Sequence, residues 1–331
     1  MTLFLLAWAL IGGSLGAWTL STSRWPEHTP RLGLAAWLLL SVSLPVMFVT
    51  AAASVLTATS LGHSVIDFFH ACIALVRRAF SGPVSPSGAD LVAVFLLLVV
   101  ARVVAQFLGD LTSSLRQRRR HRAQLRLVAA TRCSTHQDDL IVVDDARPAA
   151  FCLPGRMRTI VITTTAVTRL SPEELVAVLA HERAHLRGHH HLILAWSHAI
   201  GRGYRFLPGV AAMAKKADSL VEMVADDHAV SASSPPVLAS ALLRLVGISA
   251  AEETIGAAEV TVAARVTRLM AGEPALKRWP LSASAAALGV LTLLPAAVSV
   301  AVWVNSVGAG YRASAKSVDR ALTCAFVVVR V

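Results

Sequence analysis

Four long apolar segments dominate the hydrophobic pattern of this chain. They cover about residues 3–20, 32–56, 91–108 and 281–304. A helix needs about 20 apolar residues to cross a bilayer, so each segment is long enough to do so. Pro45 and Pro295 lie inside two of the segments, where a membrane helix tolerates proline if its neighbours satisfy the freed carbonyl group. The pattern predicts a membrane α-helical protein with about four transmembrane helices.

A different pattern fills the stretch between the third and fourth apolar segments. Two runs rich in β-branched residues, 140–143 and 159–164, are bounded by turn residues and predict strands. Amphipathic periodicity predicts helices over residues 171–188, 192–206, 217–231, 236–248 and 258–271. The sequence therefore predicts four parts: a transmembrane region (1–108), an inserted α+β domain (109–280), a transmembrane helix (281–304) and a short tail (305–331).

The placement of positive charge predicts the orientation of these spans. Only 15% of the 331 residues are charged and 55% are hydrophobic, whereas a soluble domain carries about 25% charged residues. Six arginines follow the third span directly, at positions 116, 118, 119, 120, 122 and 126. Because arginine-rich flanks stay in the cytoplasm, we expect a multi-pass protein of the cell membrane whose domain 109–280 is cytoplasmic. We assign the net charge of +11 to contacts with membrane lipid, and we expect no direct nucleic-acid partner.

The four cysteines give no sign of a compact metal or redox motif. Cys72, Cys133, Cys152 and Cys324 show no CxxC spacing, so neither a zinc knuckle nor a redox pair is indicated. In the predicted orientation Cys72 and Cys324 share the oxidising side of the membrane, where disulfides persist. A disulfide between them and two free thiols both stay open. So does the position of residues 64–80, which either enter the membrane or lie on its surface.

The segment His181-Glu182-Arg183-Ala184-His185 is an HExxH motif. Ser171 and Glu174 form a capping box ahead of it, so the motif is expected on a helix. Histidines four residues apart lie on one helical face and can direct a ring nitrogen each at one zinc ion. Glu182 is then placed to take a proton from water. The competing interpretation, two exposed histidines and a glutamate, is weakened by the capped helix.

Two residues compete to be the third metal ligand. Glu222 begins the segment Glu222-Met-Val-Ala-Asp226, whose two carboxylates share a helix face. One of them can bind zinc while Asp226 orients a ligand histidine. His191 instead completes the spacing HExxHxxGxxH of metzincins. We favour Glu222, because the metzincin alternative leaves Glu222 and Asp226 without a role and lacks a methionine turn.

Residues 149–230 resemble the gluzincin-type membrane peptidases, which include HtpX-like proteases and the BlaR/MecR antirepressors. The resemblance rests on Ser171–Ala180 before the HExxH motif, on Glu222–Asp226 after it, and on a strand edge at Ala150 and Phe151 upstream. It implies a zincin-like metalloprotease domain with one Zn²⁺ per chain and an edge strand that binds substrate. Three spans before the domain and one after it resemble the BlaR/MecR arrangement. The BlaR/MecR sensor domain has no counterpart after residue 304, so the chain is expected to be a sensorless member.

The resemblance implies a membrane zinc endopeptidase that cleaves a protein, specifically a DNA-binding repressor of the BlaI type, in a signalling response. Quality control of membrane proteins, as in HtpX-like proteases, is an alternative. A non-catalytic receptor or scaffold is another. The residue that stabilises the oxyanion is left open among Tyr204, His228 and Arg202.

Overall fold

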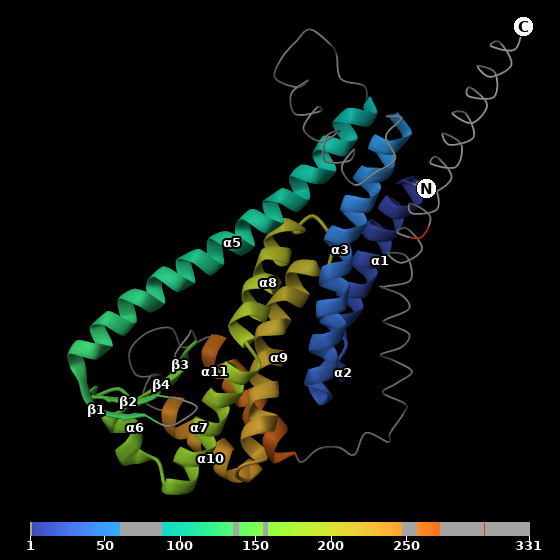
Figure 1. Ribbon diagram of the computed structural model, residues 1–331. Helices are drawn as coiled ribbons and strands as arrows, with labels where there is room; N and C mark the ends of the chain where they lie inside the picture. The colour runs from blue at the N-terminus through green and yellow to red at the C-terminus, as the bar shows by residue number, and fades with distance from the viewer. Residues whose placement is uncertain are drawn as a thin grey trace, which may run out of the picture.

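A computed structural model describes residues 2–59, 88–134, 139–154, 158–246 and 257–271, together with residue 301. Long helices form the upper part of the molecule and a small sheet with shorter helices forms the lower part (Figure 1). The N-terminal helices are α1 (Thr2–Thr22), α2 (Trp25–His28), α3 (Pro30–Thr59) and α5 (Gly88–Val128). They are followed by α6 (Thr164–Arg169), α7 (Pro172–Arg187), α8 (His190–Gly203), α9 (Val210–Val230), α10 (Pro235–Val246) and α11 (Ala257–Met270).

Four strands form one mixed sheet in the order β1-β2-β4-β3. They are β1 (Ala129–Ser134), β2 (Asp139–Val143), β3 (Ala150–Leu153) and β4 (Thr159–Thr163). Strand β2 runs parallel to β4, whereas β1 and β3 pair antiparallel with their neighbours. Every residue of β4 is buried, as expected for a β-branched central strand. Strand β3 is an edge strand and lies against α7.

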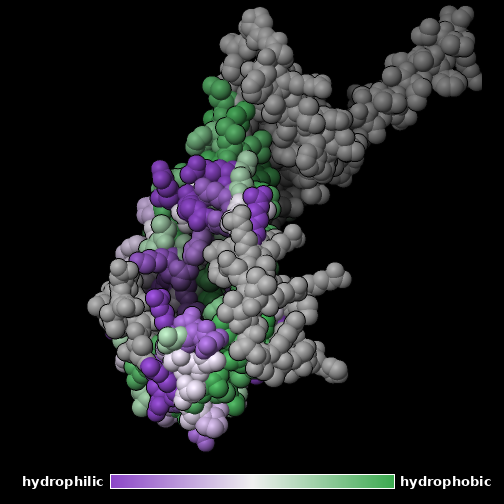
Figure 2. Space-filling view, turned by 90° about the vertical axis from the view of Figure 1, so that its left-hand side faces the viewer, coloured by the Kyte–Doolittle hydropathy of each residue, from purple (hydrophilic) through white to green (hydrophobic). Residues whose placement is uncertain are grey.

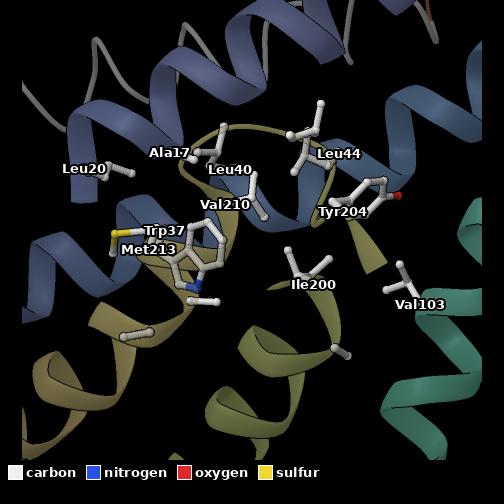
Figure 3. Close-up of a cluster of buried hydrophobic side chains, with 14 of the residues drawn as sticks. Ala17, Leu20, Trp37, Leu40, Leu44, Val103, Ile200, Tyr204, Val210 and Met213 are labelled. Carbon is white, nitrogen blue, oxygen red and sulfur yellow. The ribbon is translucent and has the colours of Figure 1, made fainter. Parts of the chain in front are cut away.

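Helices α8 and α9 pack against α1, α3 and α5 in one apolar cluster (Figure 3). Trp37, Ile200 and Met213 are among its fully buried side chains. Two reciprocal hydrogen bonds join α3 to α8, because Trp37 donates to Ser197 and Trp196 donates to Ser41, each at 2.9 Å. The predicted transmembrane helices and the α+β domain therefore share one core.

Two stretches of the described chain are long and apolar enough to cross a membrane: Pro30–Ala52 in α3 and Val94–Ser114 in α5. Other helices bury more than half of the first stretch, but only 11% of the second. Leu91, Phe95 and Leu98 are each more than half exposed. Hydrophobic residues accordingly cover the upper surface on this side, and hydrophilic residues gather lower down (Figure 2).

Most predicted elements are present, with shifted ends. The first three predicted spans are helical, but α5 continues for 41 residues, through the arginine-rich segment, instead of ending near residue 108. Helix α9 begins at Val210, seven residues before the prediction, after Gly209 in a left-handed conformation with φ of 81°. Helices α2 and α6 and strand β1 were not predicted. The fourth predicted span (281–304) lies outside the described residues except for residue 301, and so do the segment 64–80, Cys72 and Cys324.

Candidate metal centre

Helix α7 carries both histidines of the HExxH motif on one face. A full capping box fixes its start, because the Ser171 hydroxyl accepts from the Glu174 amide and the Glu174 carboxylate accepts from the Ser171 amide. His181 and His185 follow one turn apart and therefore point the same way. Their Nε2 atoms lie 3.1 Å from each other. Two imidazole nitrogens thus converge on one point.

Glu222, from α9, joins the two histidines. Its carboxylate oxygens lie 3.4 Å from Nε2 of His181 and 3.5 Å from Nε2 of His185. The donor atoms of the three residues all lie within 4.8 Å of one another. Tetrahedral zinc with ligands at 2.0–2.1 Å holds its ligand atoms about 3.3 Å apart. The three side chains are therefore close enough to supply three ligands to one zinc ion, which would leave a fourth position for water or substrate.

Asp226, one turn after Glu222 on α9, lies behind His181. Its Oδ1 is 3.1 Å from Nδ1 of His181, the ring nitrogen turned away from the metal-binding group. The carboxylate is fully buried, so Asp226 is not part of a solvated acidic patch. A carboxylate in this place fixes the tautomer and the orientation of a metal-binding imidazole.

Arg265, from α11, holds both carboxylates of α9. Its Nε and Nη2 donate to the two oxygens of Asp226 at 2.7 and 2.5 Å, and its Nη1 lies 3.0 Å from Glu222. The side chain is buried. A guanidinium bound to a carboxylate through two N–H groups has a fixed relative geometry. Arg265 was not identified from the sequence. The sequence offers only a weak signal: Arg265 and Arg268 are three residues apart on a predicted helix and could pair with Asp226 and Asp227 on another.

Burial and charge separate the pKa values of the three metal-binding side chains. Burial alone would lower the pKa of His181, but Asp226 and Glu222 outweigh it and raise the pKa to about 9. Burial lowers the pKa of His185 to about 4. Burial would raise the pKa of Glu222, but the hydrogen bond with His181 and the charge of Arg265 lower it to about 2. Near neutral pH the metal-free site therefore carries one proton that zinc must displace, on His181.

We expect zinc binding near neutral pH to release one proton, so that the zinc affinity depends on pH. Because the pKa of His181 is about 9 and that of His185 is about 4, the affinity should rise about tenfold per pH unit between these values. It should level off above pH 9, where His181 has already lost its proton. Calorimetry in buffers of different ionisation enthalpy measures the proton released at pH 7. A value near zero would contradict this charge arrangement.

Glu182 lies between the metal-binding group and strand β3. The Cys152 side chain, on β3, hydrogen-bonds its carboxylate. Burial raises the pKa of Glu182, although the charge of His181 and the hydrogen bond with Cys152 oppose the rise. A carboxylate whose pKa is raised toward neutrality is better suited to take and return a proton. The position and the raised pKa of Glu182 are both compatible with the predicted role of general base.

The predicted substrate edge, Ala150 and Phe151, lies on β3 beside α7. Ala150 pairs with Ile162 and Phe151 with Val161, both on β4. The other side of β3 forms the edge of the sheet. Phe151 is partly exposed. An extended peptide could therefore add to β3 through main-chain hydrogen bonds.

Several sequence candidates lie outside this group. His191 is not among the metal-binding residues found in the described chain, and its ring packs near that of His189 at 6.1 Å. Tyr204 follows α8, a helix of 14 residues that is about 21 Å long. Tyr204 lies in the apolar cluster (Figure 3), and its ring centroid is 5.2 Å from that of Phe48. It is thus at the end of α8 opposite His190, which contacts His185. Arg202 pairs with Asp110 of α5 near the same end of α8.

Two of the three candidates for the oxyanion-stabilising residue are thus too far from the metal-binding group for that role. Tyr204 and Arg202 are held at the far end of α8 by packing and by an ion pair. His228 stays a candidate. Its side chain is largely exposed, and its partial burial together with the charges of Arg31 and Arg187 lowers its pKa. The sequence could not separate the three, because their distance from the metal-binding group depends on how α8 packs.

Residues 114–270 match the sequence model of peptidase family M48. The matched segment includes the three candidate metal ligands, His181, His185 and Glu222. It also includes Glu182, Asp226 and Arg265. Searches of curated proteins and of solved structures gave no match. M48 peptidases are in general zinc-dependent, in agreement with the His/His/Glu group. Residues 114–270 of this chain are therefore similar to the metallopeptidases of family M48.

Proposed function

We propose that this chain is a membrane-anchored zinc endopeptidase whose metal is held by His181, His185 and Glu222. The observation that carries the proposal is the convergence of the three side chains: the two Nε2 atoms lie 3.1 Å apart, and Glu222 has one carboxylate oxygen 3.4 Å from His181 and the other 3.5 Å from His185, close enough to share one zinc ion. The M48 match supports the same chemistry. Zn²⁺ in this site would polarise the scissile carbonyl group and lower the pKa of the attacking water.

The protein's own side chains perform the proton transfers. Glu182 takes a proton from the attacking water and delivers it to the leaving amine, so that hydrolysis consumes one water molecule per bond. Asp226 and Arg265 hold His181 and Glu222 in place during this exchange. The substrate lies extended along β3, which places its backbone beside α7 and the Glu182 carboxylate.

The apolar surface of α5 supports an anchor in the membrane. The stretch Val94–Ser114 is apolar but almost unburied by the rest of the described chain, and such a surface is stable in lipid. Arg116 and the other arginines follow this stretch, and by the positive-inside rule they support a cytoplasmic metal centre. A multi-pass protein of the cell membrane is the proposed location.

The proposed substrate is a protein with an exposed, extended segment. The sequence prediction names a DNA-binding repressor of the BlaI type, and this stays a prediction. The M48 match fits the HtpX-like side of the resemblance, for which membrane-protein quality control is the alternative function. Proteomics of cells with the wild-type chain or the Glu182→Gln variant distinguishes the two substrates. In the variant cells, an uncut repressor should accumulate if the repressor is the substrate, and damaged membrane proteins should accumulate if the function is quality control.

The third ligand provides a direct test of the metal site. We expect Glu222→Gln to weaken zinc affinity about 10- to 100-fold, because the ligand loses its charge while the helix stays intact. His191→Ala should leave zinc affinity unchanged. Competition with a chromophoric chelator measures both variants in detergent micelles. Weak binding by His191→Ala and normal binding by Glu222→Gln would replace this assignment with a metzincin site.

A further inference from the structure

His190, the first residue of α8, contacts the metal-binding His185 from behind. Its Nδ1 lies 3.0 Å from Nδ1 of His185, and the two ring centroids are 4.8 Å apart. The His190 side chain is buried, with only 4% of the residue exposed. The contact uses the nitrogen of His185 opposite the metal-binding Nε2. His190 is therefore outside the set of metal ligands but within hydrogen-bond distance of one.

The metal-binding geometry fixes the direction of this hydrogen bond. Nε2 of His185 needs its lone pair to bind a metal, so the single proton of the neutral ring resides on Nδ1. Nδ1 of His185 must then donate, and Nδ1 of His190 must accept. Asp226 occupies the corresponding place behind Nδ1 of His181. Each histidine ligand thus has its own acceptor, a carboxylate for one and an imidazole for the other.

The turn between α7 and α8 is shaped to bring His190 to this place. His189 has a left-handed backbone with φ of 48°, the only positive φ of a non-glycine residue in the described chain. A residue in the left-handed conformation changes the direction of the chain sharply, at an energetic cost for any residue that has a Cβ atom. A Cβ atom on Gly188 would lie 2.4 Å from Nε2 of His190. The glycine therefore leaves the space that the His190 ring occupies.

We propose that His190 is a positioning residue that accepts the Nδ1–H of His185 and so holds His185 in the tautomer that binds zinc. The inference rests on the proposed zinc site and adds a residue that neither the HExxH motif nor the segment Glu222–Asp226 contains. Acceptors of this kind behind metal-binding histidines typically account for a 10- to 100-fold difference in metal affinity.

Three variants of the full chain in detergent micelles test the proposal. His190→Leu fills the space without an acceptor and should weaken zinc affinity about 10- to 100-fold. His190→Asn offers its amide oxygen near the place of Nδ1 and should restore most of that loss. Gly188→Ala keeps His190 but displaces its ring, so it should weaken binding as well. His198→Leu is the control, because His198 lies on the same helix but pairs with Asp218 at the surface.

Chelator competition gives the zinc affinity, and the absorption spectrum of Co²⁺ in the site reports ligand geometry without requiring activity. Thermal unfolding of the zinc-free variants shows whether they fold. Zinc binding by His190→Leu as tight as wild type overturns the proposal, and so does an asparagine variant as weak as the leucine variant. If the leucine variant does not fold, wild-type affinity in Gly188→Ala overturns it. A wild-type chain that binds no zinc overturns the proposed function as well.

Discussion

Replacement of Glu182 by glutamine is expected to lower kcat for peptide hydrolysis about 100- to 10,000-fold, the range for a lost general acid–base residue. The side chain lies between the metal-binding group and β3, within hydrogen-bond reach of Cys152. Glutamine keeps its size but cannot take a proton from water. Zinc affinity should change little, because Glu182 is not one of the three ligands. The predicted result is therefore a metal-loaded protein that does not cut.

Hydrolysis of a quenched peptide library and the zinc content of the same preparation give the two quantities. Glu173→Gln is the matched control, because Glu173 lies on the same helix but is exposed near its first turn. Glu173→Gln should hydrolyse peptides at the wild-type rate. If Glu182→Gln does so too, Glu182 is not the base. A wild-type chain that holds stoichiometric zinc but hydrolyses no peptide would instead favour the non-catalytic receptor or scaffold.

The parts of the site that the sequence predicted depend on local geometry. Residues four apart on a helix share a face whatever the rest of the fold does. This rule suffices to place His181 beside His185, and Glu222 on the face of Asp226. It does not place the two helices beside each other. The choice of Glu222 over His191 therefore had to rest on the role it gives to Glu222 and Asp226 and on the missing methionine turn. The packing of α7 against α9 then brings the two pairs together.

The parts that the sequence could not predict depend on contacts between distant segments. Arg265 lies 39 residues after Asp226, and no periodicity links them. Strand β1 has the sequence Ala-Ala-Thr-Arg-Cys-Ser, which lacks the β-branched run that identified β2 and β4. The role of His190 depends on the left-handed backbone of His189, an unusual conformation for a side chain with a Cβ.

The shared core of α3, α5, α8 and α9 also depends on such contacts. Hydrophobic periodicity predicted α8 and α9 as parts of a soluble domain. Their apolar faces instead pack against the predicted transmembrane helices, and Tyr204 at the end of α8 reaches Phe48 of α3. A periodic pattern shows that a face is buried but does not show what buries it. The oxyanion candidates Tyr204 and Arg202 failed for this reason.

Arg265 ties the metal centre to α11, and its loss should destabilise the fold strongly. We expect Arg265→Met to lower the free energy of unfolding of the zinc-free protein by about 3–5 kcal/mol, the usual cost of removing one partner of a buried ion pair. Asp226 is fully buried, and the methionine would leave both it and Glu222 without their shared cation. The cost comes mainly from the unpaired buried charge, so the size of the substituted side chain matters little.

Chemical denaturation in detergent micelles with a chelator present measures this loss. Arg244→Met is the control, because Arg244 is more than half exposed and its buried partner Glu174 keeps its hydrogen bonds from the Ser171 amide and the Ser240 hydroxyl. Its loss should therefore cost only about 1 kcal/mol. Replacing Arg265 and Asp226 together by apolar residues should cost less than the sum of the single changes, since the fully buried Asp226 carboxylate is then no longer left without Arg265. If Arg265→Met destabilises the protein no more than Arg244→Met, the carboxylates of α9 do not depend on α11. Their orientation toward His181 and His185 would then come from α7 and α9 alone.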